Sequence, residues 1–159
     1  MMADKIEDVG AGTMPFIIKE KKYLLSPIAM GDLADFAQYV KSRRVEVIQD
    51  VKKRKIQKAK KEQSNLNLLA IELNNINKEM LEMELAVMES IVDMDREMLT
   101  FDGTRYLLWK SLSIKQPELD FEDVDKMIDM DNIEEIVKVL LKLGKKPINP
   151  TKVAEEKKK

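Results

Sequence analysis

The sequence predicts a mainly α-helical protein with a small N-terminal β-hairpin, a long charged helical hairpin or coiled coil, and a C-terminal cluster of three short helices. Three observations predict this class. Of the 159 residues, 44% are hydrophobic and 36% are charged, a composition typical of long helices with solvated faces. Residues 32–102 contain neither Gly nor Pro, the two strongest helix breakers. Apolar residues recur through this segment at helical spacing.

The β-hairpin is expected within residues 14–27. Two runs of β-forming residues, 16–18 and 23–25, flank the polar segment 19–22, which has the length of a hairpin connection. A two-stranded hairpin is only marginally stable in water, so we expect it to pack on a helix or on another subunit. The preceding residues 1–13 have no periodicity and are predicted to be a flexible lead-in.

A long helical segment is expected over residues 31–99, with Asp32 at its start and a break near 63–65. Residues 41–62 carry ten basic and three acidic side chains, a net charge of +7, whereas residues 66–99 carry two basic and eight acidic side chains, a net charge of −6. Opposite charges favour pairing of the two halves. The two halves could pair as the arms of one antiparallel helical hairpin, or halves from different chains could pair in a self-associating bundle. A third alternative is that residues 31–99 form one continuous helix.

Three short helices are expected over residues 104–144. Thr104 is predicted to cap the first of them, which ends before Pro117, and Asp120 to cap the second. Asp131 and Asn132 repeat this pattern before a third helix that ends at Gly144. Together with the preceding elements they form one predicted domain, residues 14–144. The lysine-rich residues 145–159 are predicted to be a flexible tail.

Composition excludes several classes of function. The chain has no His and no Cys, the residues on which most zinc sites, redox centres and catalytic triads depend. No Walker loop, Rossmann glycine pattern or nucleophile elbow occurs. The acidic residues between 120 and 135 lack the glycine and the closing glutamate of an EF-hand loop, so helix capping explains them better. We therefore expect no enzyme activity, no metal site and no cofactor.

Membrane association is not expected either, because no apolar run approaches the length of a membrane span and no secretory signal precedes residue 14. The formal net charge of −1 gives no overall attraction to nucleic acid or membrane. The expected location is the cytoplasm.

Two surfaces are candidates for partner binding. The first is an apolar face in the methionine-rich part of the long segment, which suits adaptable contacts with partner helices, although a core or a self-association seam is the simpler interpretation. The second is a basic patch that suits an acidic partner or, as a lesser alternative, nucleic acid, for which it lacks aromatic residues. The apolar face comprises Leu73, Met80, Met83, Val87, Ile91 and Met94, and the basic patch comprises Lys52, Lys53, Arg54 and Lys55.

Two stretches carry a family resemblance. They are FIIKEKKYLLSPIAMGDLADF, residues 16–36, and DGTRYLLWKSLSIKQPELDFEDVDKMIDMDNIEEIVKVLLKLG, residues 102–144. The first resembles the short Tyr-Leu hairpin and Gly-Asp-Leu helix start of the tail assembly chaperones of tailed bacteriophages. The second resembles their Leu-Trp-x-Ser-Leu helix, Pro-Glu-Leu turn and acidic-capped helices. The charged middle, residues 41–99, departs from that pattern.

The resemblance implies a non-enzymatic protein of phage tail morphogenesis. Such a chaperone binds the long, aggregation-prone tape measure protein in the host cell cytoplasm and keeps it soluble until the tail tube polymerises around it. The alternatives are a structural component of the virion, such as a tail or head-tail connector protein built on a self-associating helical bundle, and a nucleic-acid-binding accessory protein. Expected partners are the tape measure protein or other tail proteins, with self-association as an alternative.

Overall fold

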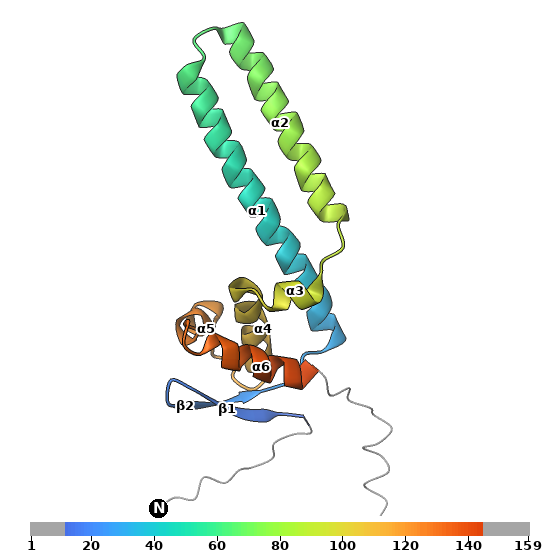
Figure 1. The fold of residues 1–159 in the computed structure, drawn as a ribbon, viewed down its shortest axis with the longest axis vertical. Coiled ribbons are helices and arrows are strands. Elements are labelled where there is room, and N and C mark those ends of the chain that lie inside the picture. Colours follow the sequence, from blue (N-terminus) through green and yellow to red (C-terminus); the bar gives the residue numbers. More distant parts are fainter. Residues whose placement is uncertain (1–11, 145–159) are drawn as a thin grey trace, which may run out of the picture. The chain divides into compact units, whose positions relative to one another are not determined.

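The computed structural model describes residues 12–144 and confirms the mainly helical class with its N-terminal β-hairpin and short C-terminal helices (Figure 1). Most of the predicted lead-in, residues 1–11, and the predicted tail, residues 145–159, lie outside the described residues. The chain forms two compact units. The first combines residues 12–33 with residues 98–144, and the second is residues 34–97.

The β-hairpin consists of β1 (Met14–Ile18) and β2 (Lys21–Leu25), which pair antiparallel. Its turn is the two-residue segment Lys19 and Glu20, both with positive φ, at 47° and 67°. The predicted four-residue connection was thus too long, because Lys21 and Lys22 belong to β2. Two-residue turns with positive φ match the right-handed twist of the flanking strands, and here that match places two non-glycine residues in a left-handed conformation.

Helix α4 (Phe101–Ser113) lies at the centre of the first unit, where it contacts β2, α5 (Phe121–Met127) and α6 (Ile133–Gly144). Its leucines Leu107, Leu108 and Leu112 are completely buried. The β-hairpin therefore packs on a helix, which is one of the two ways in which it was expected to gain stability.

The start of α4 differs from the prediction. Thr100, not Thr104, is the N-cap, and its hydroxyl oxygen accepts a hydrogen bond from the backbone N–H of Gly103. Thr104 is buried inside the helix, where its hydroxyl donates to the carbonyl of Met98 at 3.0 Å. A buried threonine hydroxyl needs such a hydrogen-bond partner, and Thr104 finds it in the interior of the unit. The N-cap of α4 therefore lies one turn earlier, at Thr100.

Polar contacts join β2 to the end of α4. The Ser26 N–H donates to the Ser111 carbonyl at 3.0 Å, and the Ser111 hydroxyl donates to the Ser26 carbonyl at 2.7 Å. The side-chain amide of Gln116 accepts from the Leu24 N–H at 3.2 Å and donates to the Leu24 carbonyl at 3.3 Å. The Gln116 amide thus takes the place of a neighbouring strand for one residue of β2.

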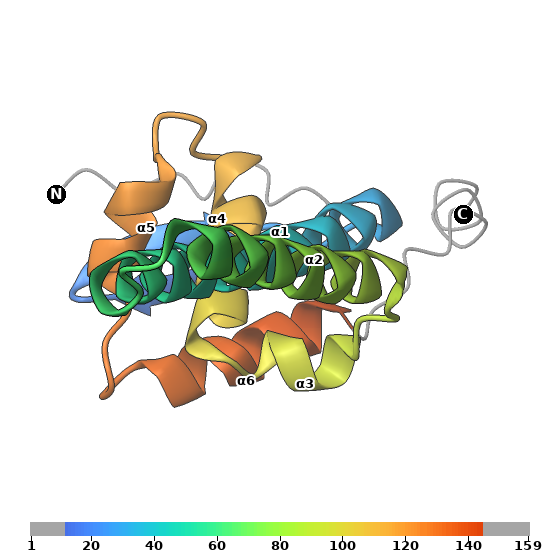
Figure 2. The same ribbon diagram turned by 90° about the horizontal axis from the view of Figure 1, so that it is seen from above.

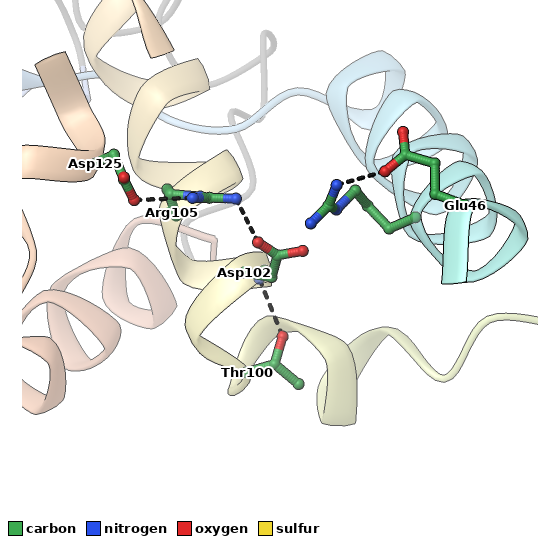
Figure 3. A network of polar contacts seen from close by, with 7 residues as sticks. Glu46, Thr100, Asp102, Arg105 and Asp125 are labelled. Atoms are coloured by element: carbon green, nitrogen blue, oxygen red, sulfur yellow. Dashed lines mark hydrogen bonds and ion pairs between the residues drawn. The ribbon is translucent and has the colours of Figure 1, made fainter. Parts of the chain in front are cut away.

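Arg105 links α4 to α5 (Figure 3). Its guanidinium contacts the carboxylates of Asp102, within α4, and of Asp125, on α5, the latter at 2.8 Å. It also lies over the ring of Phe121, 4.7 Å from the centroid. Trp109 meets the same ring edge-on at 5.7 Å and is only partly buried, so it borders the core formed by the α4 leucines.

Acidic side chains bind backbone N–H groups at the start of α5 and in the turn before α6. Asp120 accepts from the Asp123 N–H at 2.8 Å, and the Asp123 carboxylate accepts in return from the Asp120 N–H, which forms a capping box at the start of α5. Before α6, Asp129 accepts from the N–H groups of Asp131 and Asn132. The Asn132 side chain accepts in return from the Asp129 N–H at 2.9 Å, so Asp129 and Asn132 close the turn that leads into α6 through reciprocal bonds.

The predicted helical segment 31–99 consists of three helices. They are α1 (Met30–Glu62), α2 (Leu66–Glu89) and α3 (Met94–Met98). Helix α1 starts two residues before Asp32, whose carboxylate accepts from the Ala29 N–H at 3.0 Å. Within the second unit α1 and α2 run side by side and antiparallel, and they form the helical hairpin (Figures 1 and 2).

We expect Glu20→Gly to raise the free energy of unfolding of the first unit by about 0.5 to 1 kcal/mol, because glycine adopts a positive φ without the steric cost that other residues incur. Urea denaturation followed by tryptophan fluorescence measures the change. The matched control is Lys22→Gly, in a strand and without a positive φ, which should lower stability by a similar amount. Equal losses in both variants would show that the turn carries no strain.

Candidate partner-binding site

The helical hairpin turns at residues 63–65. Asn65 caps α2, and its side-chain oxygen accepts from the N–H groups of Asn67 at 3.0 Å and Leu68 at 3.2 Å. The Gln63 N–H still donates to the Ala59 carbonyl, and the Gln63 side chain accepts from the Asn65 N–H. These bonds satisfy backbone groups that the ends of α1 and α2 would otherwise leave unpaired, so a short polar turn joins the two helices.

A narrow apolar seam holds α1 against α2. Ile48 and Ala59 of α1 are buried against Ile76 and Met80 of α2, and further aliphatic residues pack around this cluster. The surrounding, partly buried residues are Ile56, Leu69, Leu73 and Val87. Each arm of the helical hairpin therefore buries the apolar side chains of one face against the other arm, and the remaining faces of both arms are exposed.

Polar contacts bind the two arms at several levels. The Lys55 ammonium contacts the Glu79 carboxylate at 2.8 Å, and the Lys41 ammonium donates to the carbonyl of Met88 at 2.7 Å. Beyond the two arms, Arg44 of α1 pairs with Glu97 of α3, whose side chain is 17% exposed. A basic arm thus meets an acidic arm, the complementarity that the charge distribution predicted. Within α1, Arg43 also pairs with Glu46, whose side chain is labelled in Figure 3.

The structure separates the six residues of the predicted apolar face. Met80 is buried to 1% exposure, and Leu73 and Val87 pack against the seam. Met83 and Ile91 are exposed, at 44% and 95%, and Ile91 lies beyond the end of α2. The sixth residue, Met94, is half-buried and belongs to α3. Three of the six residues therefore line the internal seam of the helical hairpin, and the other three lie outside it.

The predicted basic patch is also divided. Lys55 is engaged with Glu79, Lys53 lies 3.5 Å from Asp50 of its own helix, and Lys52 is half-buried. Arg54 is exposed, and among the described residues no ion pair engages it. The same holds for Lys58, Lys60 and Lys61, which continue the basic character toward the turn.

Charge is divided along the length of the helical hairpin. The half that contains the turn, residues 52–78, is called the tip here, and it carries eight basic and two acidic side chains, a net charge of +6. The other half of the second unit, residues 34–51 and 79–97, is called the base, and it carries four basic and ten acidic side chains, a net charge of −6. The unit is therefore neutral overall but strongly polarised.

The tip also exposes aliphatic side chains that sequence reasoning did not select. Leu66, Leu68 and Ile71 are 79%, 51% and 59% exposed. At 100° per residue these three side chains point in different directions around α2, so no single periodic stripe in the sequence marks them. Exposed aliphatic residues beside unpaired cations form a surface suited to an acidic partner with apolar contacts of its own.

The first unit contains an open hollow of about 450 Å³ between the β-hairpin and α5. Lys19 lies at its edge, where its ammonium donates to the Lys126 carbonyl at 2.8 Å and pairs with Asp129 at 3.1 Å. The hydrogen bond from Lys19 lowers the pKa of Asp129 from its ordinary value. These charged groups hold the β-hairpin turn against the segment after α5. Their role is to stabilise the first unit.

Among residues 12–144, no cluster of acidic side chains has a geometry that would hold a metal ion. Within the same residues, no helix combines the length and the apolar character needed to cross a membrane. Comparison of the chain with protein-family models, with curated proteins and with solved structures gives no match.

We expect Met80→Ala to lower the free energy of unfolding of the helical hairpin by about 2 to 5 kcal/mol, because truncation of a buried methionine leaves a cavity in the seam. Met83→Ala is the matched control on the same helix, and its effect should stay within about 0.5 kcal/mol because this side chain is largely exposed. Urea denaturation followed by circular dichroism measures both. Similar losses would contradict the assignment of the seam.

Proposed function

We propose that this chain is a non-enzymatic binding protein whose basic helical tip captures an acidic, helical partner during assembly of a larger structure. The observation that carries this proposal is the tip itself, a net charge of +6 beside exposed leucine and isoleucine side chains. Cations that are not neutralised within the described part of the chain are available to a partner. Exposed aliphatic residues beside them add apolar contact area.

The specific form of the proposal is a phage tail assembly chaperone that binds the tape measure protein, as the resemblance of residues 16–36 and 102–144 implies. Those residues lie mainly in the first unit, whereas the charged middle supplies the helical hairpin. On this proposal the first unit is the family's common part, and the helical hairpin is the arm that reaches the client. An amphipathic client helix with acidic flanks would match the tip by charge and by apolar contact.

Nucleic acid is a second candidate partner, because the tip concentrates the cations that phosphate binding requires. Against it, residues 40–100 contain no Phe, Tyr or Trp, so the tip offers no aromatic platform on which bases could stack. We therefore place an acidic protein helix first. A virion structural role is separated from a chaperone role by mass spectrometry of purified particles, since a chaperone should be depleted from them.

We expect Arg54→Glu combined with Lys58→Glu to weaken client binding at least about tenfold, because both cations are replaced by charges that an acidic partner repels. The two residues are four apart on one face of α1 and have no ion pair among the described residues. The test co-expresses the chain with a phage tape measure protein as the client and measures the soluble fraction of that client. The wild-type chain should keep the client soluble, and the double variant should not.

The control makes the same change in charge elsewhere, as Lys22→Glu combined with Lys115→Glu, both exposed residues of the first unit. This control should retain client binding. A client that stays equally soluble without the chain would refute the chaperone role. A complex that disappears on nuclease treatment would replace the protein client with nucleic acid.

A further inference from the structure

A second stripe of side chains runs along α2, away from the seam. Because an α-helix has 3.6 residues per turn, successive steps of 4, 4, 3, 4 and 4 residues keep side chains on one face. Six exposed residues of α2 follow these steps, and none of them belongs to the buried cluster. They are Leu66, Ala70, Asn74, Asn77, Leu81 and Leu85. Leu81 and Leu85 are 56% and 52% exposed, so the stripe presents substantial uncovered apolar surface.

The spacing of this stripe is the same when it is read from either end, with its midpoint between residues 75 and 76. A two-fold contact between identical helices requires such symmetry, because residue i of one copy meets residue j of the other while j meets i. Antiparallel pairing of two stripes about this midpoint aligns Leu66 with Leu85 of the second copy, Ala70 with Leu81, and Asn74 with Asn77.

The aligned residues are also chemically compatible. The outer pair joins two leucines, and the next joins a small alanine to a leucine, which allows the helices to approach closely. The central pair joins two asparagines, whose side-chain amides each donate and accept hydrogen bonds. A polar residue within an otherwise apolar helix seam lowers stability but specifies register and orientation. The two central asparagines would therefore select this alignment over shifted ones.

Charge selects the same orientation. In an antiparallel pair, the tip of one helical hairpin, with a net charge of +6, lies beside the base of the other, with a net charge of −6. A parallel pair would place tip beside tip and base beside base, with like charges in contact. Long-range electrostatics thus favours the arrangement that the stripe requires.

We propose that the stripe on α2 binds a second copy of this chain, so that two helical hairpins associate antiparallel, tip against base, about the midpoint between residues 75 and 76. A single helix-pair contact is small compared with permanent dimer interfaces, so we expect a dissociation constant on the order of micromolar. The proposal concerns a different face from the seam and does not depend on the identity of the client.

Sedimentation equilibrium of the full chain over a range of concentrations tests the association. We expect the mass to rise toward twice the 18.4 kDa of one chain. Leu81→Glu should weaken the dimer at least about tenfold, because it places a charge within the apolar part of the contact. Leu68→Glu is the matched control, since Leu68 is 51% exposed on α2 but lies outside the stripe, and it should change the constant less than about twofold.

Disulfide trapping tests the orientation. The chain has no Cys, so each introduced thiol is unique. In the proposed pairing residue 66 meets residue 85, whereas equivalent residues lie about 28 Å apart along the axis, far beyond the roughly 7 Å that a disulfide tolerates between Cα atoms. A mixture of Leu66→Cys and Leu85→Cys chains should therefore form a disulfide-linked dimer on oxidation, and neither variant alone should do so.

Several results would overturn the proposal. They are a mass that stays at one chain at all concentrations, equal effects of Leu81→Glu and Leu68→Glu when both variants retain wild-type helix content, and self-linking of the Leu66→Cys chain. The last of these would indicate parallel pairing. A monomer in every experiment would assign the stripe to a different partner.

Discussion

The narrow aliphatic seam between α1 and α2 is the contact on which the second unit depends. Two helices with opposite charge attract each other, but exposed ion pairs add little to stability, whereas burial of Ile48, Ile76 and Met80 removes apolar surface from water. Ala59 keeps the arms close near the tip. The seam therefore sets which faces of both helices remain outside, and with them the polarised surface that carries the proposed binding.

The first unit depends on the contact between its β-hairpin and α4. Its β-hairpin has too few strands to be stable alone, and α4 supplies both the apolar surface and the polar partners that a larger sheet would provide. The Ser26 and Ser111 pair and the Gln116 amide fix where β2 ends on the helix. This unit also holds most of the two stretches with family resemblance, so the contacts that make it stable involve the same residues as the resemblance.

Sequence reasoning identified the helical class, the β-hairpin and the charge complementarity of the long segment, because periodicity and composition report these directly. It placed the start of α4 at Thr104 and not at Thr100, since both are threonines with capping chemistry and only packing distinguishes them. It also assigned Met80 and Met83 to one surface, although the first is buried and the second exposed. A helix can carry two apolar stripes, and sequence alone does not tell which of them its neighbour covers.

The distribution of aromatic residues gives the two units separate optical signatures. Trp109 is the single tryptophan, and it lies in the first unit with Phe121 and Tyr106 around it. No aromatic residue occurs between residues 40 and 100, so most of the helical hairpin contributes nothing to emission and much to the far-ultraviolet dichroism. Tryptophan fluorescence therefore follows the first unit alone, and a difference between this signal and the dichroism during denaturation measures how strongly the units unfold together.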